Sequence, residues 1–315
     1  FGYDRIPFRA EGYTVIAKAV VNASGPWVEQ VARRALSGRN APPPTIRLVK
    51  GSHIVVPRIS GANDAYIFQN TDGRIVFALP YEGAFTLIGT TDTPFSGDPR
   101  TVVATADDDA YLLALANRYF RTKLASHDII WRFAGVRPLD DDGMDNPSAV
   151  SRDYRLQLES NATPPILHII GGKITTYRKL AEAALDQLQP FLDMGPAWTA
   201  SAALPGGDVG TGGFDNWFNE LAARRPGFTR ETLTRLARRY GTRIDTLLDN
   251  AVSEDDLGEH LGGRLSAREV EFLKSEEWAT TADDVIWRRT KAALHVPPHM
   301  REALAAKVTA ALARA

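Results

Sequence analysis

The run PPILHIIGGKITTYRKLAEAALDQL, residues 164–188, decides the fold of this chain. Residues 166–170 are apolar and rich in β-branched side chains, and they lie between two prolines and two glycines, which is typical of a buried strand. After the glycines, apolar side chains recur at helical spacing with charged side chains between them. The run therefore predicts a strand, a glycine turn and an amphipathic helix that begins near Thr175 or Thr176, with Thr175 as its cap.

The glycine turn of this run is a candidate ligand site. A strand, two glycines and a helix start bring unpaired backbone N–H groups and the positive end of a helix dipole to one point. Gly172 lets a ligand approach the backbone closely, and Lys173 adds a full positive charge. This chemistry suits a phosphate or the edge of a flavin ring. The alternative is an ordinary α/β connection whose lysine points to solvent.

A second unit of the same kind lies near the start of the chain. Residues 13–21 (YTVIAKAVV) predict one strand, the segment NASGPW predicts a turn, and a helix is expected over about residues 27–36. Gly25 gives this turn close backbone approach, and Pro26 suits the first position of a helix. A routine strand-to-helix connection is again the alternative.

The composition limits the class of protein. The chain has 315 residues, 44% of them hydrophobic, which is enough for a sizeable core and about two domains. A net charge of −1 makes nucleic acid an unlikely main partner, and the absence of cysteine excludes disulfides and cysteine-ligated metals. No apolar run reaches the roughly 18 residues of a transmembrane helix. No metal site is expected, because two prolines separate the one close histidine pair, His295 and His299.

The middle of the chain has a β pattern. Short runs rich in Val, Ile, Phe, Tyr and Thr over residues 45–92 predict an antiparallel sheet. A helix is expected over residues 107–124 and a further strand over residues 128–139. His53 lies inside the first run, GSHIVVP, and should project from the sheet as either a structural histidine or a catalytic one.

Arg137 is a second candidate, at the end of the strand over residues 128–139. Its guanidinium could bind a carboxylate or a phosphate through two N–H groups. The alternative is a structural ion pair with Asp140 or Asp141.

The region after Pro196 has a helical pattern, so a domain boundary is expected near Gly195. Its run SAREVEFLKSEEW begins with a capping box formed by Ser266 and Glu269. The runs TADDVIWRRTKAAL and REALAAKVTAALARA complete this helical region.

Several long motifs occur in one order and together closely resemble the FAD-dependent, respiratory glycerol-3-phosphate dehydrogenases. The motifs that carry this resemblance are NASGPW, RLVKGSHIVVPR, LIGTTDTPFSGDP, FAGVRPL, SRDY, GGKITTYRKLAE, PAWTASAALPGG and DDVIWRRTKAAL. The resemblance implies a mixed α/β fold with an amino-acid-oxidase-like FAD-binding domain. It places residues 1–44 and 140–195 in that domain, residues 45–139 in a mainly antiparallel substrate domain, and residues 196–315 in an all-α C-terminal domain.

The resemblance also implies an activity, partners and a location. Such enzymes oxidise sn-glycerol 3-phosphate to dihydroxyacetone phosphate, pass a hydride to FAD, and then reduce a quinone. The implied location is cytoplasmic and peripheral, at the surface of the inner membrane, and a homodimer is left open.

The family motifs imply roles for particular residues. Arg137 would bind the substrate phosphate, Lys173 would lie beside flavin and substrate, and His53 would accept a proton or contact the phosphate. The remaining matched residues would line the FAD, and these are Gly25, Pro26, Gly172, Thr175 and Thr176.

The chain departs from the family at one point. The N-terminal GxGxxG fingerprint for the FAD pyrophosphate is not found in these residues, so we expect a fragment of the enzyme, inactive if it holds no flavin. Two alternatives stay open: another flavoprotein oxidoreductase of this fold acting on an amino acid or 2-hydroxy acid, and a non-catalytic docking or dimerisation fragment.

Overall fold

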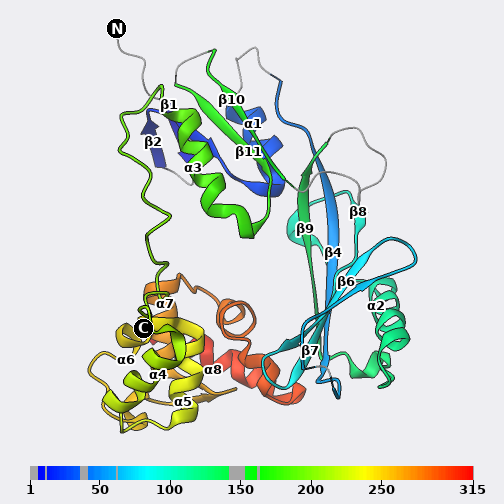
Figure 1. The fold of residues 1–315 in the computed structure, drawn as a ribbon, viewed down its shortest axis with the longest axis vertical. Helices are drawn as coiled ribbons and strands as arrows, with labels where there is room; N and C mark the ends of the chain where they lie inside the picture. The colour runs from blue at the N-terminus through cyan, green and yellow to red at the C-terminus, as the bar shows by residue number, and fades with distance from the viewer. Residues whose placement is uncertain are drawn as a thin grey trace. The chain divides into compact units, whose positions relative to one another are not determined.

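A computed structural model describes residues 6–10, 13–35, 42–61, 63–141, 153–161 and 164–314 (Figure 1). The chain divides into two compact units, Phe1–Ala200 and Ser201–Ala315, and each is treated by itself. Among the described residues, no helix combines the length and the apolar character that crossing a bilayer requires.

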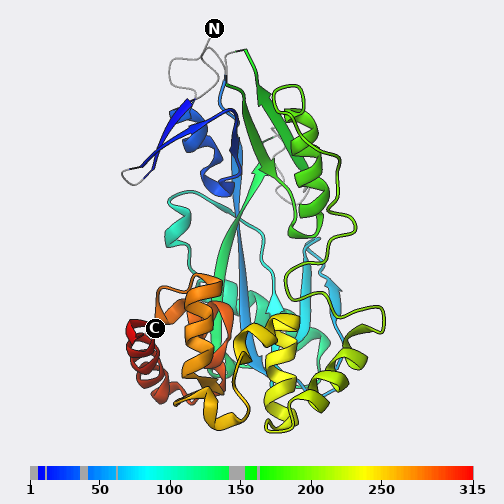
Figure 2. The same ribbon diagram turned by 90° about the vertical axis from the view of Figure 1, so that its left-hand side faces the viewer.

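The first layer of the N-terminal unit is a small sheet between two helices (Figure 2). Its central strand, β11 (Ile166–Gly171), pairs in parallel with β3 (Val20–Asn22) and antiparallel with β10 (Tyr154–Glu159). Helix α3 (Tyr177–Leu188) covers one face, and α1 (Val28–Ala35) lies on the other. The near-continuous apolar sequence of β11 follows from this burial on both faces.

The strand predicted over residues 13–21 is two strands. β2 (Tyr13–Ala17) pairs antiparallel with β1 (Ile6–Ala10), whereas β3 pairs with β11 after a bend at Lys18 and Ala19. The two halves belong to different sheets, which a continuous apolar pattern does not reveal.

The second layer is a six-stranded antiparallel sheet organised around β4 (Ile46–Pro57). β4 pairs with three strands, so the sheet predicted over residues 45–92 is confirmed. The other strands are β5 (Tyr66–Gln69), β6 (Ile75–Tyr81), β7 (Phe85–Gly89), β8 (Thr93–Phe95) and β9 (Trp131–Asp140).

One face of this sheet is covered by α2 (Ala106–Tyr119). Ile54, Val56 and Ile88 pack against Leu112 in a single buried cluster. Successive residues of a strand point to opposite faces, so the odd-numbered residues of β4, His53 among them, lie on the face turned away from α2. That face carries the candidate site.

Helix α2 is shorter than the predicted range 107–124. It ends at Tyr119 because Phe120 adopts an extended conformation. The amide of Asn117 then forms hydrogen bonds with both backbone groups of Leu124, at 2.7 and 2.8 Å, and folds the following segment back on the helix.

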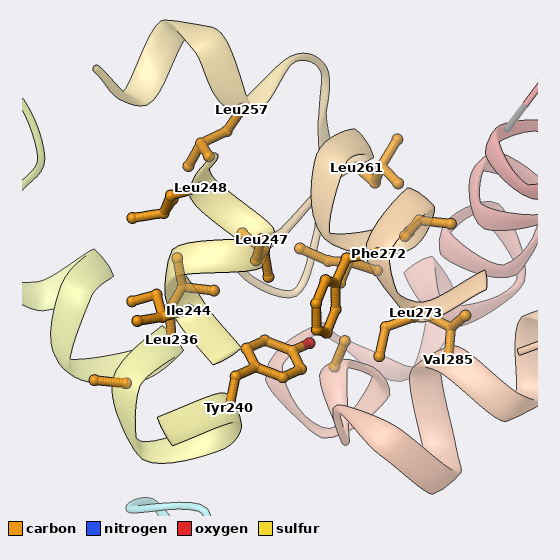
Figure 3. Close-up of a cluster of buried hydrophobic side chains, with 14 of the residues drawn as sticks. Leu236, Tyr240, Ile244, Leu247, Leu248, Leu257, Leu261, Phe272, Leu273 and Val285 are labelled. Carbon is orange, nitrogen blue, oxygen red and sulfur yellow. The ribbon is translucent and has the colours of Figure 1, made fainter. Parts of the chain in front are cut away.

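The C-terminal unit is mainly helical and encloses its own apolar core (Figure 3). It is not the all-α domain that the resemblance implies, because two short strands, β12 (His260–Gly262) and β13 (Leu265–Ser266), pair antiparallel within it. Its α-helices are α4 (Gly213–Arg224), α5 (Arg230–Tyr240), α6 (Ile244–Leu248), α7 (Ala267–Glu277) and α8 (Arg301–Arg314). Leu236, Leu247 and Phe272 are among the core side chains in view.

The run TADDVIWRRTKAAL lies in the predicted helical region but does not form a regular α-helix. It forms a π-helix, Asp284–Arg289, followed by a 3₁₀ turn, Ala292–His295. The backbone N–H of Thr290 donates to the carbonyl oxygen of Val285, and so does the Thr290 hydroxyl, at 3.0 and 2.7 Å. This wide turn ends the helix early.

Glu269 holds α5 and α7 together. Ser266 caps α7 by accepting a bond from the Glu269 N–H at 3.3 Å, but the Glu269 carboxylate points into the core rather than back to the cap. It accepts hydrogen bonds from Arg235, Arg239 and the Tyr240 hydroxyl at 2.8, 2.6 and 2.8 Å. Burial, followed by the nearby Glu269 charge, raises the pKa of Tyr240 well above its ordinary value.

The substitution Glu269→Gln should destabilise the C-terminal unit by about 3–5 kcal/mol, because it leaves two arginines without their buried counter-charge. Glu271→Gln, on the exposed face of the same helix, should change the unfolding free energy by less than about 0.5 kcal/mol. Urea denaturation followed by circular dichroism measures both values. Equal midpoints for the two variants would show that the Glu269 cluster adds no stability.

A second buried polar contact joins β3 to β11. The amide of Asn22 donates to the carbonyl oxygen of Val28 and lies 2.9 Å from Nδ1 of His168. Nε2 of His168 is buried without a partner among the described residues. Burial lowers the pKa of His168, although the charge of Glu159 opposes this shift.

The pH dependence of stability should report this burial. Below the ordinary pKa of 6.5 the unfolded chain binds a proton that folded His168 does not, so the unfolding free energy falls as the pH drops below about 6.5. His168→Asn, which keeps an acceptor toward Asn22, should reduce the slope near pH 5.5 by up to about 1.4 kcal/mol per pH unit. His127→Asn, at an exposed site, is the control, and an identical slope in all three proteins would contradict the assignment.

Candidate active site

His53 lies on the sheet face turned away from α2. It pairs across the ladder with Gly89 of β7 and with Phe133 of β9. Its ring stacks on Phe133, with centroids 4.9 Å apart and planes 3° from parallel. A Cβ atom at Gly89 would come within 2.1 Å of the His53 ring, so the ring lies across this glycine instead of projecting freely from the sheet.

The environment of His53 keeps its imidazole neutral. Nδ1 is buried and has no hydrogen-bond partner among the described residues. Burial, and then the positive charge of Arg137, lower the pKa of His53 from 6.5 to about 4. A neutral imidazole with a free ring nitrogen can accept a proton at neutral pH.

Arg137 lies on the same face, beside Gly51. Its guanidinium donates hydrogen bonds to Asp92 and, at 3.0 Å, to the hydroxyl oxygen of Thr90. A Cβ atom at Gly51 would lie only 2.7 Å from Nη2 of Arg137, so the glycine makes room for the guanidinium. The side chain keeps 32% exposure, while that of Asp92 keeps 7%.

The predicted partners of Arg137 are wrong. Asp140 instead binds Arg155 at 2.6 Å, and Asp141 binds Arg47 at 3.0 Å. The sheet register decides this, since β4 and the chain after β7 bring residues 90–92 beside Arg137. The guanidinium has five N–H donors, so two bonds to protein leave donors for an anion.

The two glycine turns lie at one edge of the small sheet. β3 and β11 run parallel, with Asn22 opposite His168, so the chain leaves both strands at the same end. Gly25 and Gly172 have φ values of +55° and +91°, which favour glycine. Pro26 is in the first turn of the 3₁₀ helix that follows β3, as predicted.

The turn after β11 differs from prediction in its cap. A 3₁₀ turn, Ile174–Thr176, precedes α3, and Thr176 rather than Thr175 is at the cap position. Its hydroxyl donates to the carbonyl oxygen of Lys173 at 3.0 Å and does not cap the helix. Gly172, Lys173 and Thr175 are exposed, so the turn is accessible to a ligand.

The exposed turns fit a flavin. A Cβ atom at Gly25 would meet nothing within 4 Å, so the space beside this turn is open. Gly171 lies against β9, where a Cβ atom would be 3.8 Å from the carbonyl oxygen of Pro138, the residue after Arg137. The structure thus brings the turn that carries Lys173 next to the strand that carries Arg137.

Four residues of this site carried no predicted role. Thr90 and Asp92 fix the arginine, and Gly51 and Gly89 provide space for the arginine and the histidine. The sequence offered one sign of these residues: the segments GSH and GTTD interrupt β-like runs. Which residues meet across the sheet depends on a strand register that this pattern does not define.

Two family models together match most of the chain. Residues 5–178 match the FAD dependent oxidoreductase family, and residues 197–315 match the C-terminal domain of alpha-glycerophosphate oxidase.

Curated relatives carry related names. A glycerol-3-phosphate dehydrogenase of Pseudomonas aeruginosa is 51% identical over 92% of this chain and 57% of its own length. The aerobic glycerol-3-phosphate dehydrogenase of Escherichia coli is 45% identical over 89% of the chain and 56% of the relative. A D-erythritol 1-phosphate dehydrogenase of Brucella abortus is 43% identical over 93% and 58%. The chain thus spans a little over half the length of these relatives.

A solved structure supports the same assignment. The glycerol-3-phosphate dehydrogenase of Bacillus halodurans, complexed with FAD, matches with a TM-score of 0.78 and 30% identity, over 96% of this chain and 60% of that one. The resemblance drawn from the motifs is confirmed by these matches and by both family models. The chain therefore belongs to the family of FAD-dependent oxidoreductases and carries the C-terminal domain found in alpha-glycerophosphate oxidase.

Proposed function

We propose that this chain belongs to an enzyme that oxidises sn-glycerol 3-phosphate to dihydroxyacetone phosphate with FAD. One observation carries the proposal: a partly exposed, buttressed guanidinium and a neutral histidine share one sheet face, and two glycine turns lie at the end of the neighbouring small sheet. A phosphate dianion needs a fixed cation, and an alcohol being oxidised must lose its hydroxyl proton. The relatives are named for glycerol 3-phosphate and D-erythritol 1-phosphate, and both compounds are polyol phosphates.

The roles divide among the chain's own residues. Arg137 binds the phosphate through donors that Asp92 and Thr90 leave free. A ring nitrogen of His53 accepts the proton of the C2 hydroxyl, because its pKa of about 4 keeps it neutral at physiological pH. Lys173 places positive charge at the turn where negative charge would develop.

FAD would be held at the edge formed by the ends of β3 and β11. The residues proposed to line it are Gly25, Pro26, Gly172, Lys173, Thr175 and Thr176. When bound, FAD supplies the acceptor for the hydride from C2. The helix start after each turn directs backbone N–H groups toward a ligand there.

The alternatives are less well supported. An amino-acid or 2-hydroxy-acid oxidoreductase could use Arg137 for a carboxylate, but the relatives named above act on phosphorylated polyols by name. A non-catalytic docking module would gain nothing from the Arg137–Asp92 ion pair or from the buried His53 on the same sheet face, so these residues argue against that alternative.

The electron acceptor and the location are also proposals. We infer that electrons pass to a quinone and that the enzyme works at the inner-membrane surface, on the cytoplasmic side. The support is the word aerobic in the name of the Escherichia coli relative. Reduction of a water-soluble quinone by the substrate-reduced enzyme tests the first point, co-sedimentation with lipid vesicles tests the second, and analytical ultracentrifugation tests for a homodimer.

Arg137→Ala in the FAD-loaded enzyme should raise KM for sn-glycerol 3-phosphate by about 100-fold or more, because a charged, desolvated contact to the phosphate is lost. The flavin absorbance bands should remain, since Arg137 lies on the substrate sheet. Arg132→Gln, on the same strand but bound to Asp109, is the matched control. An unchanged KM would remove Arg137 from the phosphate site.

His53→Asn should slow flavin reduction by roughly 100- to 10,000-fold, the usual contribution of a general base. The low pKa of His53 also sets a pH profile: the wild-type rate at limiting substrate should fall on the acid side nearer pH 4 than pH 6.5. Stopped-flow reduction of FAD between pH 4.5 and 8 measures this. The substrate phosphate itself ionises at about pH 6, so only a limb near 6.5 that is present in wild type and absent from His53→Asn would contradict His53 as the neutral base.

A further inference from the structure

Asp108 lies behind the candidate site, on the sheet face covered by α2. Its residue is only 6% exposed. One carboxylate oxygen, Oδ2, accepts four hydrogen bonds: from Lys50 Nζ at 2.7 Å, from the Ser52 hydroxyl at 2.9 Å, and from the N–H and hydroxyl of Thr105 at 2.8 and 2.9 Å. Burial by itself raises the pKa of Asp108, yet these bonds bring it below its ordinary value, so the group is an anion.

The partners of Asp108 reach through the sheet to the residues that hold Arg137. Lys50 pairs across the ladder with Thr93 and with Val136, which directly follow Asp92 and directly precede Arg137. The Lys50–Asp108 ion pair therefore fixes β4 where β8 and β9 pair with it, next to Asp92 and Arg137.

A second connection runs through Ser52. Its backbone N–H donates to the Thr91 hydroxyl oxygen at 3.0 Å. The Thr90 hydroxyl donates to the carbonyl oxygen of Thr91 at 3.0 Å and accepts from Nη2 of Arg137 at 3.0 Å. Hydrogen bonds that are joined through the covalent frames of Ser52 and Thr91 thus lead from Asp108 on one face to the guanidinium on the other.

Helix capping alone does not account for Asp108. Its bonds to Thr105 complete a capping box at the start of α2, and a solvent-exposed carboxylate could make them. The neighbouring Asp109 is equally buried at 7% exposure, but it pairs with Arg132 and has no contact with Lys50 or Ser52. Asp108 therefore differs from Asp109 in its connection to the site.

We propose that Asp108 is a positioning residue that sets the geometry of the Arg137 anion site through Lys50 and Ser52. The inference rests on the proposed function of Arg137. Loss of the Asp108 charge leaves Lys50 buried without its counter-ion, which favours a shift of β4 against β8 and β9. Displacement by about 1 Å is enough to cost a well-oriented site up to 100-fold.

The test compares Asp108→Asn with Asp109→Asn in the FAD-loaded enzyme. Stopped-flow flavin reduction over a range of sn-glycerol 3-phosphate concentrations separates the apparent dissociation constant from the limiting rate. Asp108→Asn should raise the dissociation constant at least about tenfold and lower the limiting rate by less than about threefold. Asp109→Asn should lower the melting temperature without changing the dissociation constant.

Thr91→Val serves if Asp108→Asn does not fold. It removes only the hydroxyl that accepts from Ser52, so it should raise the dissociation constant in the same direction by a smaller factor. The inference would be overturned if Asp108→Asn, or Thr91→Val in its place, had the same dissociation constant as wild type. A wild-type enzyme that does not bind sn-glycerol 3-phosphate would instead overturn the proposed function, so the two failures are distinguishable.

Discussion

The alternation of side chains along β4 is the constraint on which the six-stranded sheet and the candidate site depend. β4 pairs along its edges with β7, β8 and β9, so the register of these three ladders fixes which of its side chains point to each face of the sheet. On one face Ile54 and Val56 pack under α2, and Lys50 and Ser52 bind Asp108. On the other face Gly51 and His53 support the candidate chemistry. A slip by one residue would exchange these faces, burying the histidine and exposing the core.

The site is built by pairing charges before any ligand arrives. Arg137 is neutralised by Asp92 and oriented by Thr90, so its direction is set by the protein and not by substrate. His53, in contrast, has no counter-charge, because burial and the charge of Arg137 together lower its pKa and keep it uncharged. A cation with spare donors beside a neutral base is a preorganised arrangement, which lowers the cost of orienting groups during a reaction.

Local patterns predicted the local structure well. The strand, glycine turn and helix of residues 164–188 follow from apolar spacing and two glycines, and β11 and α3 confirm them. Arg137 could be singled out because an arginine is conspicuous at the end of an apolar strand, whereas only the pKa of a histidine and the family motif RLVKGSHIVVPR pointed to His53. What could not be predicted depends on partners distant in sequence: Asp92 rather than Asp140 beside Arg137, and Glu269 turned inward to Arg235 and Arg239 rather than toward its own helix start. These choices are made by register and packing, which single-strand periodicity does not encode.

Gly51 and Gly89 have a consequence for how this protein tolerates substitution. Neither lies in a turn, and neither has the positive φ that usually explains a required glycine. Each is needed because a neighbouring functional side chain occupies the space of its missing Cβ. A substitution to alanine would leave the strand, its ladder and the core beneath it intact, while pushing aside Arg137 or His53. Such a variant would combine a misplaced functional side chain with the cost of overpacking, typically about 1–3 kcal/mol, so its activity should fall further than its abundance in the cell.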